Sequence, residues 1–358
     1  MTLMSPPQEI ISHFCADPSS VDINSLGEGN INDTFLLCTA ERSIVLQRIN
    51  ATVFPDPNIL INNLLHLSHH FSSLTDDTEQ RWQDLTLIPS LNGAPSIRDK
   101  EGAVWRALSY IEGSVCFSRA ETELQAEQTG WALGHFHKRI AGLDVAKIQI
   151  PLPGFHKLGN YLKQYDQLSS DKKVYNSAEI TICLQSISDN KEDALFLEKT
   201  CSQESHNLQT IHGDPKIANV LFDKNSGLAI SLIDLDTVGP GILQHDIGDC
   251  LRSVCNNGGE ESKLDKVTFD LNLCKATLKG YFEASGSLLT SSDRELIYDG
   301  IKAITYELGL RFFMDYLQGG IYFKCNKPED TLGKALVQFV LLQDIIAKED
   351  TIRNLTTF

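Results

Sequence analysis

The segment IHGDPKIANVLFD, residues 211–223, places ionisable and amide side chains between apolar residues. Asp214 follows a His-Gly pair, and Asn219 comes five residues after Asp214. Each residue alone could serve only its own backbone, because Asp-Pro pairs and Asn are common in turns. Together, a carboxylate and an amide supply oxygen atoms that could hold Mg²⁺ and orient a hydroxyl group, which is what phosphoryl transfer requires.

A second acidic cluster, LIDLD, contains Asp234 fifteen residues after Asn219, and Asp236 beyond it. Between Asn219 and Asp234, VLFD and LAISLI flank the polar turn KNSG, which predicts a β-hairpin. The hairpin would return Asp234 to the side of Asn219. Protein kinases use the same order, a catalytic Asp, then an Asn, then a metal-binding Asp. The combined pattern is much more specific than any one residue and favours a reaction centre over a turn.

Composition restricts the partners of such a centre. The chain has 358 residues, enough for two domains or lobes, and its 42% hydrophobic residues can form a substantial core. The formal net charge of −16 disfavours nucleic acid and anionic membranes, because the chain would repel their phosphates. Nucleic-acid and membrane partners are therefore not expected, and the oligomeric state is left open.

The cysteines and the apolar segments predict a cytoplasmic protein. The nine Cys residues are scattered, an odd number, and lack a CxxC pair, so a disulfide framework or zinc site is not expected. The N-terminal residues lack the pattern of a signal peptide. ALVQFVLLQDII, residues 335–346, is too short for a membrane span and contains Gln338 and Asp344, so it predicts a helix facing the core.

The elements that position the polar clusters change in character along the chain. TFLLC (34–38) and SIVLQRI (43–49) predict two strands joined by a tight turn. Residues 55–74 and 121–143 have helical spacing of apolar residues, and most of the chain beyond residue 260 is also helical in pattern. In 121–143 the expected buried stripe is Leu124, Trp131, Leu133, Phe136 and Ile140. A sheet-rich part therefore joins a helix-rich part near Glu112, which predicts an α+β fold with a ligand cleft between the parts.

HGDPKIANVLFD followed by LIDLDT resembles the aminoglycoside phosphotransferase and choline kinase superfamily, whose catalytic loop reads His-Gly-Asp-x-x-x-x-Asn. Three further stretches resemble its N-acetylhexosamine 1-kinase branch: GNINDTF (29–35), VLQRIN with VFPDP (45–57), and ELGLRFFMDYLQGGIYFK (307–324). The resemblance implies a protein-kinase-like two-lobe fold. It would have a small antiparallel-sheet lobe that binds the nucleotide, residues 1–111, and a larger, mainly helical catalytic and substrate-binding lobe, residues 112–358.

The resemblance also implies ATP and Mg²⁺ and assigns roles to the polar residues. Asp214 would be the catalytic base or orienting carboxylate and would contact the acceptor hydroxyl. Asn219 and Asp234 would hold Mg²⁺, and Asp236 would either support these ligands from behind or contact a second metal ion; whether one or two Mg²⁺ ions bind is left open. His212 is expected to hold the loop by a hydrogen bond. The role of Lys216 stays open between a phosphate ligand and a solvated side chain.

The residues expected to bind the nucleotide lie in a glycine-containing loop and on one strand. In LGEGNINDTF, Gly27 and Gly29 would let backbone amides approach phosphates, and Asn30 could face the cleft. Kinase-like folds usually carry a phosphate-binding Lys on the third strand, whereas this chain offers Gln47 and Arg48. Strand alternation allows only one of the two to face the cleft. Arg48 is the better electrostatic candidate, because a guanidinium binds phosphate oxygens bidentately.

The resemblance also implies roles for two further segments. WRALSYIEGS (105–114) would be the hinge, whose backbone groups read adenine. Asp246 and Asp249, in QHDIGDCLRS, would brace the catalytic loop, although an acidic residue at this place could equally cap a helix.

The acceptor side rests on residues 307–324. Glu307 and Arg311 are four residues apart and could form a pair on a helix surface. Arg311, however, is surrounded in sequence by Leu310, Phe312 and Phe313, and an Arg in apolar surroundings needs a partner. By resemblance that partner is the sugar, contacted by Arg311 and Tyr322. Tyr322 could also be only a packed aromatic residue.

The expected activity is ATP- and Mg-dependent phosphorylation of the anomeric hydroxyl of an N-acetylhexosamine, GlcNAc or GalNAc. One alternative is a kinase of another small hydroxyl compound: an aminoglycoside, choline or homoserine. Arg311 would repel a cationic acceptor, although the net charge of the chain would attract one. Another alternative is a nucleotide-binding pseudokinase, favoured only by the missing strand Lys. The exact acceptor, the anomer and the pathway are not predicted.

Overall fold

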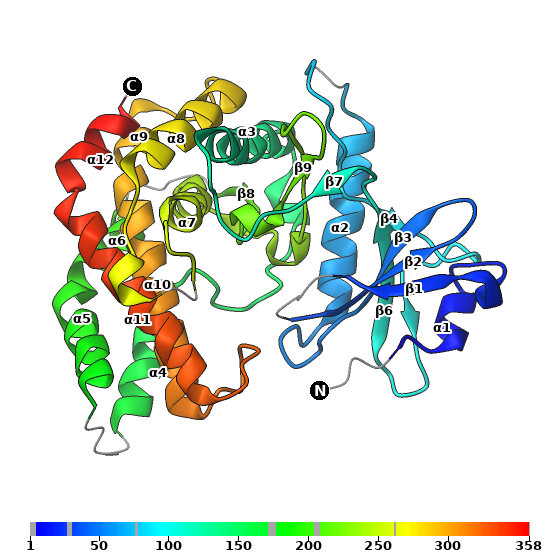
Figure 1. Ribbon diagram of the computed structural model, residues 1–358, viewed down its shortest axis with the longest axis horizontal. Coiled ribbons are helices and arrows are strands. Elements are labelled where there is room, and N and C mark those ends of the chain that lie inside the picture. The colour runs from blue at the N-terminus through cyan, green and yellow to red at the C-terminus, as the bar shows by residue number, and fades with distance from the viewer. Residues whose placement is uncertain are drawn as a thin grey trace.

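The computed structural model describes residues 5–26, 31–75, 78–170, 177–203, 208–260 and 263–357. Figure 1 shows an antiparallel sheet formed by the N-terminal segments and, beside it, a larger part made mainly of helices. The structure therefore confirms the predicted α+β, protein-kinase-like fold class. None of the helices in the described ranges is long and apolar enough to cross a membrane.

The N-terminal sheet is entirely antiparallel in the described residues, with the order β1-β2-β3-β6-β4 and β5 paired to β6. Its strands are β1 (Asp22–Ser25), β2 (Asp33–Cys38), β3 (Ser43–Arg48), β4 (Leu87–Ile88), β5 (Ile97–Arg98) and β6 (Val104–Ser109). The predicted hairpin of β2 and β3 is confirmed, with Cys38 opposite Ser43 and Asp33 opposite Arg48. The short helix α1 (Gln8–Ser12) packs on one face of this sheet, where Ile10 and Ile11 share a core with strand residues.

Helix α2 (Pro57–Ser72) lies between the two parts in Figure 1. Asp56 caps its start by accepting a hydrogen bond from the amide of Asn58, and Pro57 occupies the first turn. Leu60 and Ile61 belong to a core with residues of the sheet-rich part, whereas Leu64 and others further along pack into the large core of the helical part. Its apolar stripe thus contributes to both cores.

The helical part surrounds two small sheets. One has the order β10-β9-β7, and the other pairs β8 with β11. These strands are β7 (Ser114–Val115), β8 (Gln209–Ile211), β9 (Val220–Asp223), β10 (Ala229–Leu232) and β11 (Gly239–Gly241). The helices are α3 (Glu123–Ile140), α4 (Leu158–Ser170), α5 (Ala178–Ala194), α6 (Phe196–Gln203), α7 (Leu243–Cys255), α8 (Leu271–Ser285), α9 (Ser291–Glu295), α10 (Ile297–Gln318), α11 (Pro328–Ala347) and α12 (Glu349–Thr356).

The predicted buried stripe of α3 is partly wrong. Leu133, Phe136 and Ile140 are buried, but Trp131 is half-buried and Leu124 remains 48% exposed. Leu124 lies in the first turn of the helix, beside the turn at Gly227, and no core covers it there. The predicted core-facing helix at residues 335–346 is confirmed by α11, in which even Gln338 is fully buried.

Helices α3 and α8 approach each other closely through glycine. A Cβ atom added at Gly130 would lie 1.9 Å from the backbone oxygen of Thr277, a distance that requires the helices to separate. The substitution Gly130→Ala should therefore destabilise the fold by about 3 kcal/mol, the upper range for overpacking a core. Gly333 on α11 is the matched control, because a Cβ there meets no atom within 4 Å.

Gly333→Ala should raise stability by about 0.5–1 kcal/mol, the helix preference of Ala over Gly. Urea unfolding of both variants and the wild type measures these changes. Equal effects of the two substitutions would show that the helix contact at Gly130 does not constrain the fold.

Candidate active site

The hairpin of β9 and β10 brings the two predicted metal-binding positions together. Val220 pairs with Leu232, and the amide of Ile233 donates a hydrogen bond of 2.8 Å to the carbonyl of Asn219. Asp234 follows Ile233 directly and has a positive φ of 65°. Left-handed backbone is costly for residues other than glycine and is concentrated at functional sites. The hairpin predicted from VLFD-KNSG-LAISLI is thus confirmed, and its ends place Asn219 beside Asp234.

The catalytic-loop glycine, Gly213, is required by the backbone. It has a φ of 88°, and a Cβ atom there would lie 2.7 Å from the backbone oxygen of Thr237. His212 holds the same loop through its ring. Its Nδ1 accepts from the amide of Asp214 at 3.2 Å, so Nε2 carries the proton that it donates to the carbonyl of Ile233 at 2.9 Å. Burial lowers the pKa of His212, which agrees with a neutral ring.

Asp246 on α7 braces the loop from behind. Its Oδ2 accepts from the amide of His212 at 2.6 Å and from Nε2 of His137 at 2.9 Å, and its Oδ1 accepts from the amide of Gly213 at 2.8 Å. Burial acts to raise the pKa of Asp246, but the hydrogen bonds, chiefly from His137, lower it below its usual value. Asp249, the other residue expected to brace the loop, instead accepts from Arg252 Nε at 2.8 Å.

The carboxylate of Asp214 is anchored on one oxygen. Oδ2 accepts from Lys216 Nζ at 2.7 Å and from Asn219 Nδ2 at 3.2 Å. Within the described ranges no hydrogen bond reaches Oδ1, which is therefore available to accept from a hydroxyl group. Burial acts to raise the pKa of Asp214, but the Lys216 ammonium lowers it below its usual value. The side chain is consequently ionised at neutral pH, as an orienting carboxylate must be.

Asn219 and Asp234 offer oxygen atoms that suit a divalent cation. Asn219 uses Nδ2 to donate to Asp214, and its Oδ1 accepts no hydrogen bond from the described residues. The carboxylate of Asp234 accepts no hydrogen bond from the part of the chain that the structure describes. Desolvation in the crowded site, followed by the charges of Asp236 and Asp214, raises the pKa of Asp234 above its usual value. Since Mg²⁺ prefers oxygen ligands and offsets such repulsion, these residues fit a Mg²⁺ site.

Asp236 connects the hairpin to the N-terminal sheet. It forms a buried ion pair with Arg106 on β6 and accepts from Asn32 Nδ2 at 2.7 Å. Gln47 on β3 holds the same guanidinium, because its Oε1 accepts from Arg106 Nε at 3.0 Å and from Nη2 at 2.8 Å. Both oxygens of Asp236 are thus engaged, one by Arg106 of β6 and the other by Asn32 just before β2, so fewer of its lone pairs are available for the metal contact that the sequence suggested.

The structure brings Gln47, and not Arg48, to the ion pair of Arg106 and Asp236. Val45 packs toward the large core of the helical part, whereas Leu46 packs toward α1, and strand alternation puts Gln47 on the face of Val45. Arg48 lies on the opposite face, 36% exposed, at 3.8 Å from Asp33 and 4.0 Å from Glu101. The predicted nucleotide contacts Gly27, Gly29 and Asn30 lie outside the described residues.

Arg311 of α10, which the sequence predicts to contact the acceptor, lies among aromatic rings. Its guanidinium carbon lies 5.1–5.7 Å from the ring centroids of Phe155, Tyr161, Tyr322 and Phe323. Tyr322 Oη is 3.5 Å from Arg311 Nη2, so the predicted pair Arg311 and Tyr322 does lie together. Burial acts to lower the pKa of Arg311, but neighbouring Tyr161 and Tyr322 and the carboxylate of Glu307 raise it above its usual value.

Asp315 positions the segment that carries Tyr322. One helical turn beyond Arg311, its Oδ1 accepts from the amides of Ile321 and Tyr322 at 2.9 and 2.7 Å, and its Oδ2 accepts from Phe323 at 3.4 Å. The buried carboxylate therefore folds residues 319–323 back over the helix, where two aromatic rings reach Arg311.

Comparison with known proteins agrees with this geometry. A family model described as "Phosphotransferase enzyme family" matches residues 22–281, more than half of the chain. The chain belongs to this phosphotransferase family. It is therefore a small-molecule phosphotransferase, and the resemblance to the superfamily is confirmed at that level. The comparisons do not extend to the N-acetylhexosamine branch.

Three solved structures share the fold of this phosphotransferase. An aminoglycoside phosphotransferase from Alicyclobacillus acidocaldarius is 15% identical, with a TM-score of 0.62 and coverage of 99% of this chain and 97% of that one. Choline kinase from Cryptosporidium parvum is 12% identical, with a TM-score of 0.60 and coverage of 97% of both. Spectinomycin phosphotransferase, solved with ADP and spectinomycin, is 13% identical, with a TM-score of 0.54 and coverage of 92% and 93%.

Several residues of the phosphotransferase site were not predicted. Arg106 gave no signal because it sits in an apolar strand whose partner, Asp236, is 130 residues away. Asp315 lies one turn from Arg311, and an acidic residue at that spacing before two glycines was a usable sign of a closed turn. Phe155, Tyr161 and His156 come from a segment whose role nothing in its composition suggested.

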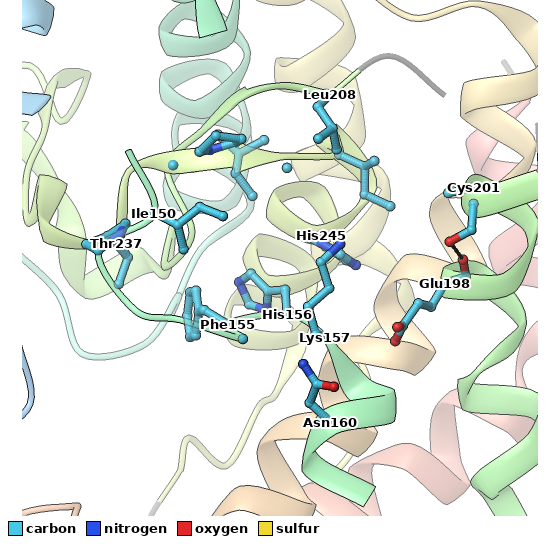
Figure 2. Close-up of a pocket in the computed structure, with 18 residues that line it drawn as sticks. Ile150, Phe155, His156, Lys157, Asn160, Glu198, Cys201, Leu208, Thr237 and His245 are labelled. Carbon is cyan, nitrogen blue, oxygen red and sulfur yellow. Dashed lines mark hydrogen bonds between the residues drawn. The ribbon is translucent and has the colours of Figure 1, made fainter. Parts of the chain in front are cut away.

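A cavity of about 430 Å³ adjoins the site and shares Phe155 and His156 with it. Its walls come from residues 150–160, α6 and the β8–β11 pair, as Figure 2 shows in close-up. Asp214, Asn219, Asp234, Arg311 and Tyr322 are not among the lining residues. The cavity meets the catalytic loop through Ile211, which precedes His212, and through His156 and Thr237, which contact the loop.

The lowered pKa of Asp246 allows a test of whether its carboxylate holds the catalytic loop in place. A carboxyl group whose pKa is depressed by folding stabilises the protein above its unfolded pKa, near 3.9 for Asp, and loses this contribution as the pH falls through the folded value. Asp246→Asn should cost about 3 kcal/mol at neutral pH, since the loop amides lose a charged acceptor. The difference from wild type should shrink below about pH 4.

Asp249→Asn, on the same helix, is the control, and the pH dependence of its effect on stability should be opposite to that of Asp246→Asn. Burial raises the pKa of Asp249, so its carboxylate costs stability above the unfolded pKa and this cost vanishes as the pH falls. Chemical unfolding of the three proteins between acid and neutral pH measures both differences. The same pH dependence for both variants would contradict the assigned role of Asp246.

Proposed function

We propose that the chain is an ATP- and Mg-dependent kinase that phosphorylates the anomeric hydroxyl of an N-acetylhexosamine, GlcNAc or GalNAc, to the sugar 1-phosphate. The observation that carries the acceptor class is Arg311 enclosed by aromatic rings beside the catalytic loop. The family membership and the ADP bound to the spectinomycin enzyme support a nucleotide as the phosphate donor. The sheet-rich lobe ending near residue 111 would bind that nucleotide, and the following residues would bind the acceptor.

The residues of the chain have separate tasks in this mechanism. Free Oδ1 of Asp214 accepts the hydrogen bond of the acceptor hydroxyl and orients its oxygen for attack, and the proton passes to the carboxylate late, because the lowered pKa makes it a weak base. Lys216 and Asn219 keep Oδ2 in place. Asn219 Oδ1 and the Asp234 carboxylate would hold Mg²⁺, which supplies charge neutralisation of the phosphate oxygens.

The surroundings of Arg311 favour a neutral or anionic acceptor over choline. Quaternary ammonium compounds are bound in cages of aromatic rings. Here the cage formed by Phe155, Tyr161, Tyr322 and Phe323 already holds the chain's own guanidinium, whose charge repels a second cation. A sugar can stack on rings with its apolar face and accept from Arg311 with a hydroxyl or acetamido oxygen. Aminoglycosides, as polycations, meet the same repulsion.

A panel of acceptors tests the proposal. The purified chain is incubated with MgATP and with GlcNAc, GalNAc, unsubstituted hexoses, homoserine, choline or an aminoglycoside, and NMR locates the phosphate in any product. We expect turnover of an N-acetylhexosamine with the phosphate on O1. Asp214→Asn should abolish that turnover while retaining nucleotide binding, which shows that the product arises at this site.

Phosphate on O6, or turnover of another acceptor only, would overturn the sugar 1-kinase proposal while leaving the family activity intact. Nucleotide binding without transfer to any acceptor, and without ATP hydrolysis, would favour a pseudokinase.

We also propose that Arg106, rather than Arg48, provides the positive charge behind the nucleotide phosphates. Arg106 is on the face of the sheet toward Asp236, is held by Gln47, and is close enough to lower the pKa of Asp234, whereas Arg48 lies on the far face. Arg106→Gln should raise the KM for ATP about tenfold or more, the effect of one charge-assisted hydrogen bond.

Arg48→Gln is the matched control and should change the KM for ATP less than twofold, as expected of an exposed ion pair. Arg106→Gln also leaves Asp236 unpaired, so the double variant Arg106→Gln/Asp236→Asn separates loss of folding from loss of binding. A normal KM in that folded double variant, with a raised KM in Arg48→Gln, would restore Arg48 to the nucleotide site.

A further inference from the structure

His156 lies between the catalytic loop and the acceptor helix, and both partners of its ring are acceptors. Nε2 is 3.0 Å from the carbonyl oxygen of Gly213, and Nδ1 is 3.1 Å from Oε1 of Glu307. A carbonyl oxygen and a carboxylate oxygen have no proton to give, so each ring nitrogen must donate one. A neutral imidazole has a single N–H, whereas an imidazolium has two.

We propose that His156 is a positioning residue that works as an imidazolium, tying the carbonyl of Gly213 to the carboxylate of Glu307 and so fixing Asp214 relative to the acceptor-binding face of α10. The position of the catalytic carboxylate follows, because Gly213 is the residue before Asp214. Glu307 and Arg311 are one helical turn apart and share a face of α10. The bridge thus spans the reacting group and the acceptor contact.

The backbone at His156 is built for this position. Its φ of 52° is left-handed, and apart from Asp234 no other non-glycine residue in the described ranges has a positive φ. A residue other than glycine is held there only when its surroundings compensate the strain. The turn around it closes with a hydrogen bond from the amide of Lys157 to the carbonyl of Gly154, and α4 begins directly afterwards. The buried hydrogen bonds of the ring supply the compensation.

Charged and titratable groups surround the ring on two helices. Burial acts against the charged form, but Glu307 and the carbonyl of Gly213 together raise the pKa of His156 above its usual value, while Arg311 opposes them. The charge of His156 also acts to lower the pKa of Asp249 on α7, against the larger effect of burial. The ring of His245, also on α7, lies 5.0 Å from that of His156, and burial followed by the His156 charge holds its pKa well below the usual value.

Figure 2 shows His156 lying between Phe155 and His245. Phe155 contacts His156 on one side and faces Arg311 with its ring. Phe155 therefore also links His156 to the aromatic rings around Arg311. Loss of the imidazolium would release both the loop carbonyl and the Glu307 carboxylate, because neither has a second donor among the hydrogen bonds of the described residues.

The protonation state is tested without any substrate. A two-bond ¹H–¹⁵N correlation spectrum of the full-length protein labelled on histidine shows whether both ring nitrogens of His156 carry protons at neutral pH, with His156→Asn identifying the signal. Asn suits the test because it tolerates left-handed backbone and cannot be an imidazolium. We expect an imidazolium in the wild type. A neutral ring facing a protonated Glu307 would overturn the proposal, whatever the acceptor.

The effect on catalysis rests on the proposed kinase function and uses MgATP with N-acetylgalactosamine, or acceptor-free ATP hydrolysis if no sugar is turned over. His156→Asn should lower kcat about ten- to a hundredfold, as expected for a misplaced reacting group, with the KM for ATP nearly unchanged. The wild-type kcat should decline as the pH rises through the raised pKa of His156. His156→Asn should lack that decline.

Two further variants assign the pH dependence. Glu307→Gln removes the charge that favours the imidazolium and should move the alkaline decline to lower pH. His245→Asn, a control on the neighbouring ring, should leave the decline where it is in the wild type. An unchanged alkaline decline in folded His156→Asn, or its loss in His245→Asn, would contradict the positioning role of His156.

Discussion

One buried carboxylate, that of Asp246, sets the position of the catalytic loop. It accepts from two consecutive loop amides and from His137, so the backbone of His212 and Gly213 is satisfied by a single side chain on α7. Helix α7 is itself fixed against α10, because a Cβ atom at Gly248 would lie 2.5 Å from the carbonyl carbon of Gly300, and one at Gly300 would lie 2.3 Å from the carbonyl oxygen of Gln244. The loop and α10, the helix proposed to bind the acceptor, therefore share one rigid reference, which is what orientation of reacting groups requires.

The second constraint joins the N-terminal sheet to this frame. The ion pair of Arg106 with Asp236 is buried, and removing two charges from water is unfavourable unless further hydrogen bonds satisfy them. Gln47 and Asn32 provide those bonds. The group adds little net stability, but its hydrogen bonds tie Asp236 to β3, to β6 and to the residue before β2. It therefore specifies how the sheet meets the turn after β10, and hence where a nucleotide on the sheet would lie relative to Asp234.

The parts of the fold and site that could be predicted are those encoded locally. The β2–β3 and β9–β10 hairpins follow from strand patterns and turn residues a few positions apart, and the second hairpin explains why Asn219 and Asp234 meet. Alternation predicted that only one of Gln47 and Arg48 faces inward, but the choice depends on which face α1 covers, a tertiary fact. Arg106 and His156 depend on partners more than a hundred residues away, and Leu124 is exposed because nothing packs over the first turn of α3.

The acceptor region shows why an aromatic cage need not indicate a cationic ligand. Four rings around a guanidinium satisfy the electrostatic preference of their faces, so the attraction that would draw a quaternary ammonium is already used within the chain. What remains outward is the donor capacity of Arg311 and the phenol of Tyr161, which stays neutral because burial raises its pKa to about 12. Donors beside apolar ring edges recognise oxygen acceptors on a partly apolar molecule. Under the proposed function, a ligand with carbonyl or hydroxyl oxygens would satisfy that surface, whereas an ammonium group would face the guanidinium, and the nearby carboxylate of Glu307 is already engaged by His156.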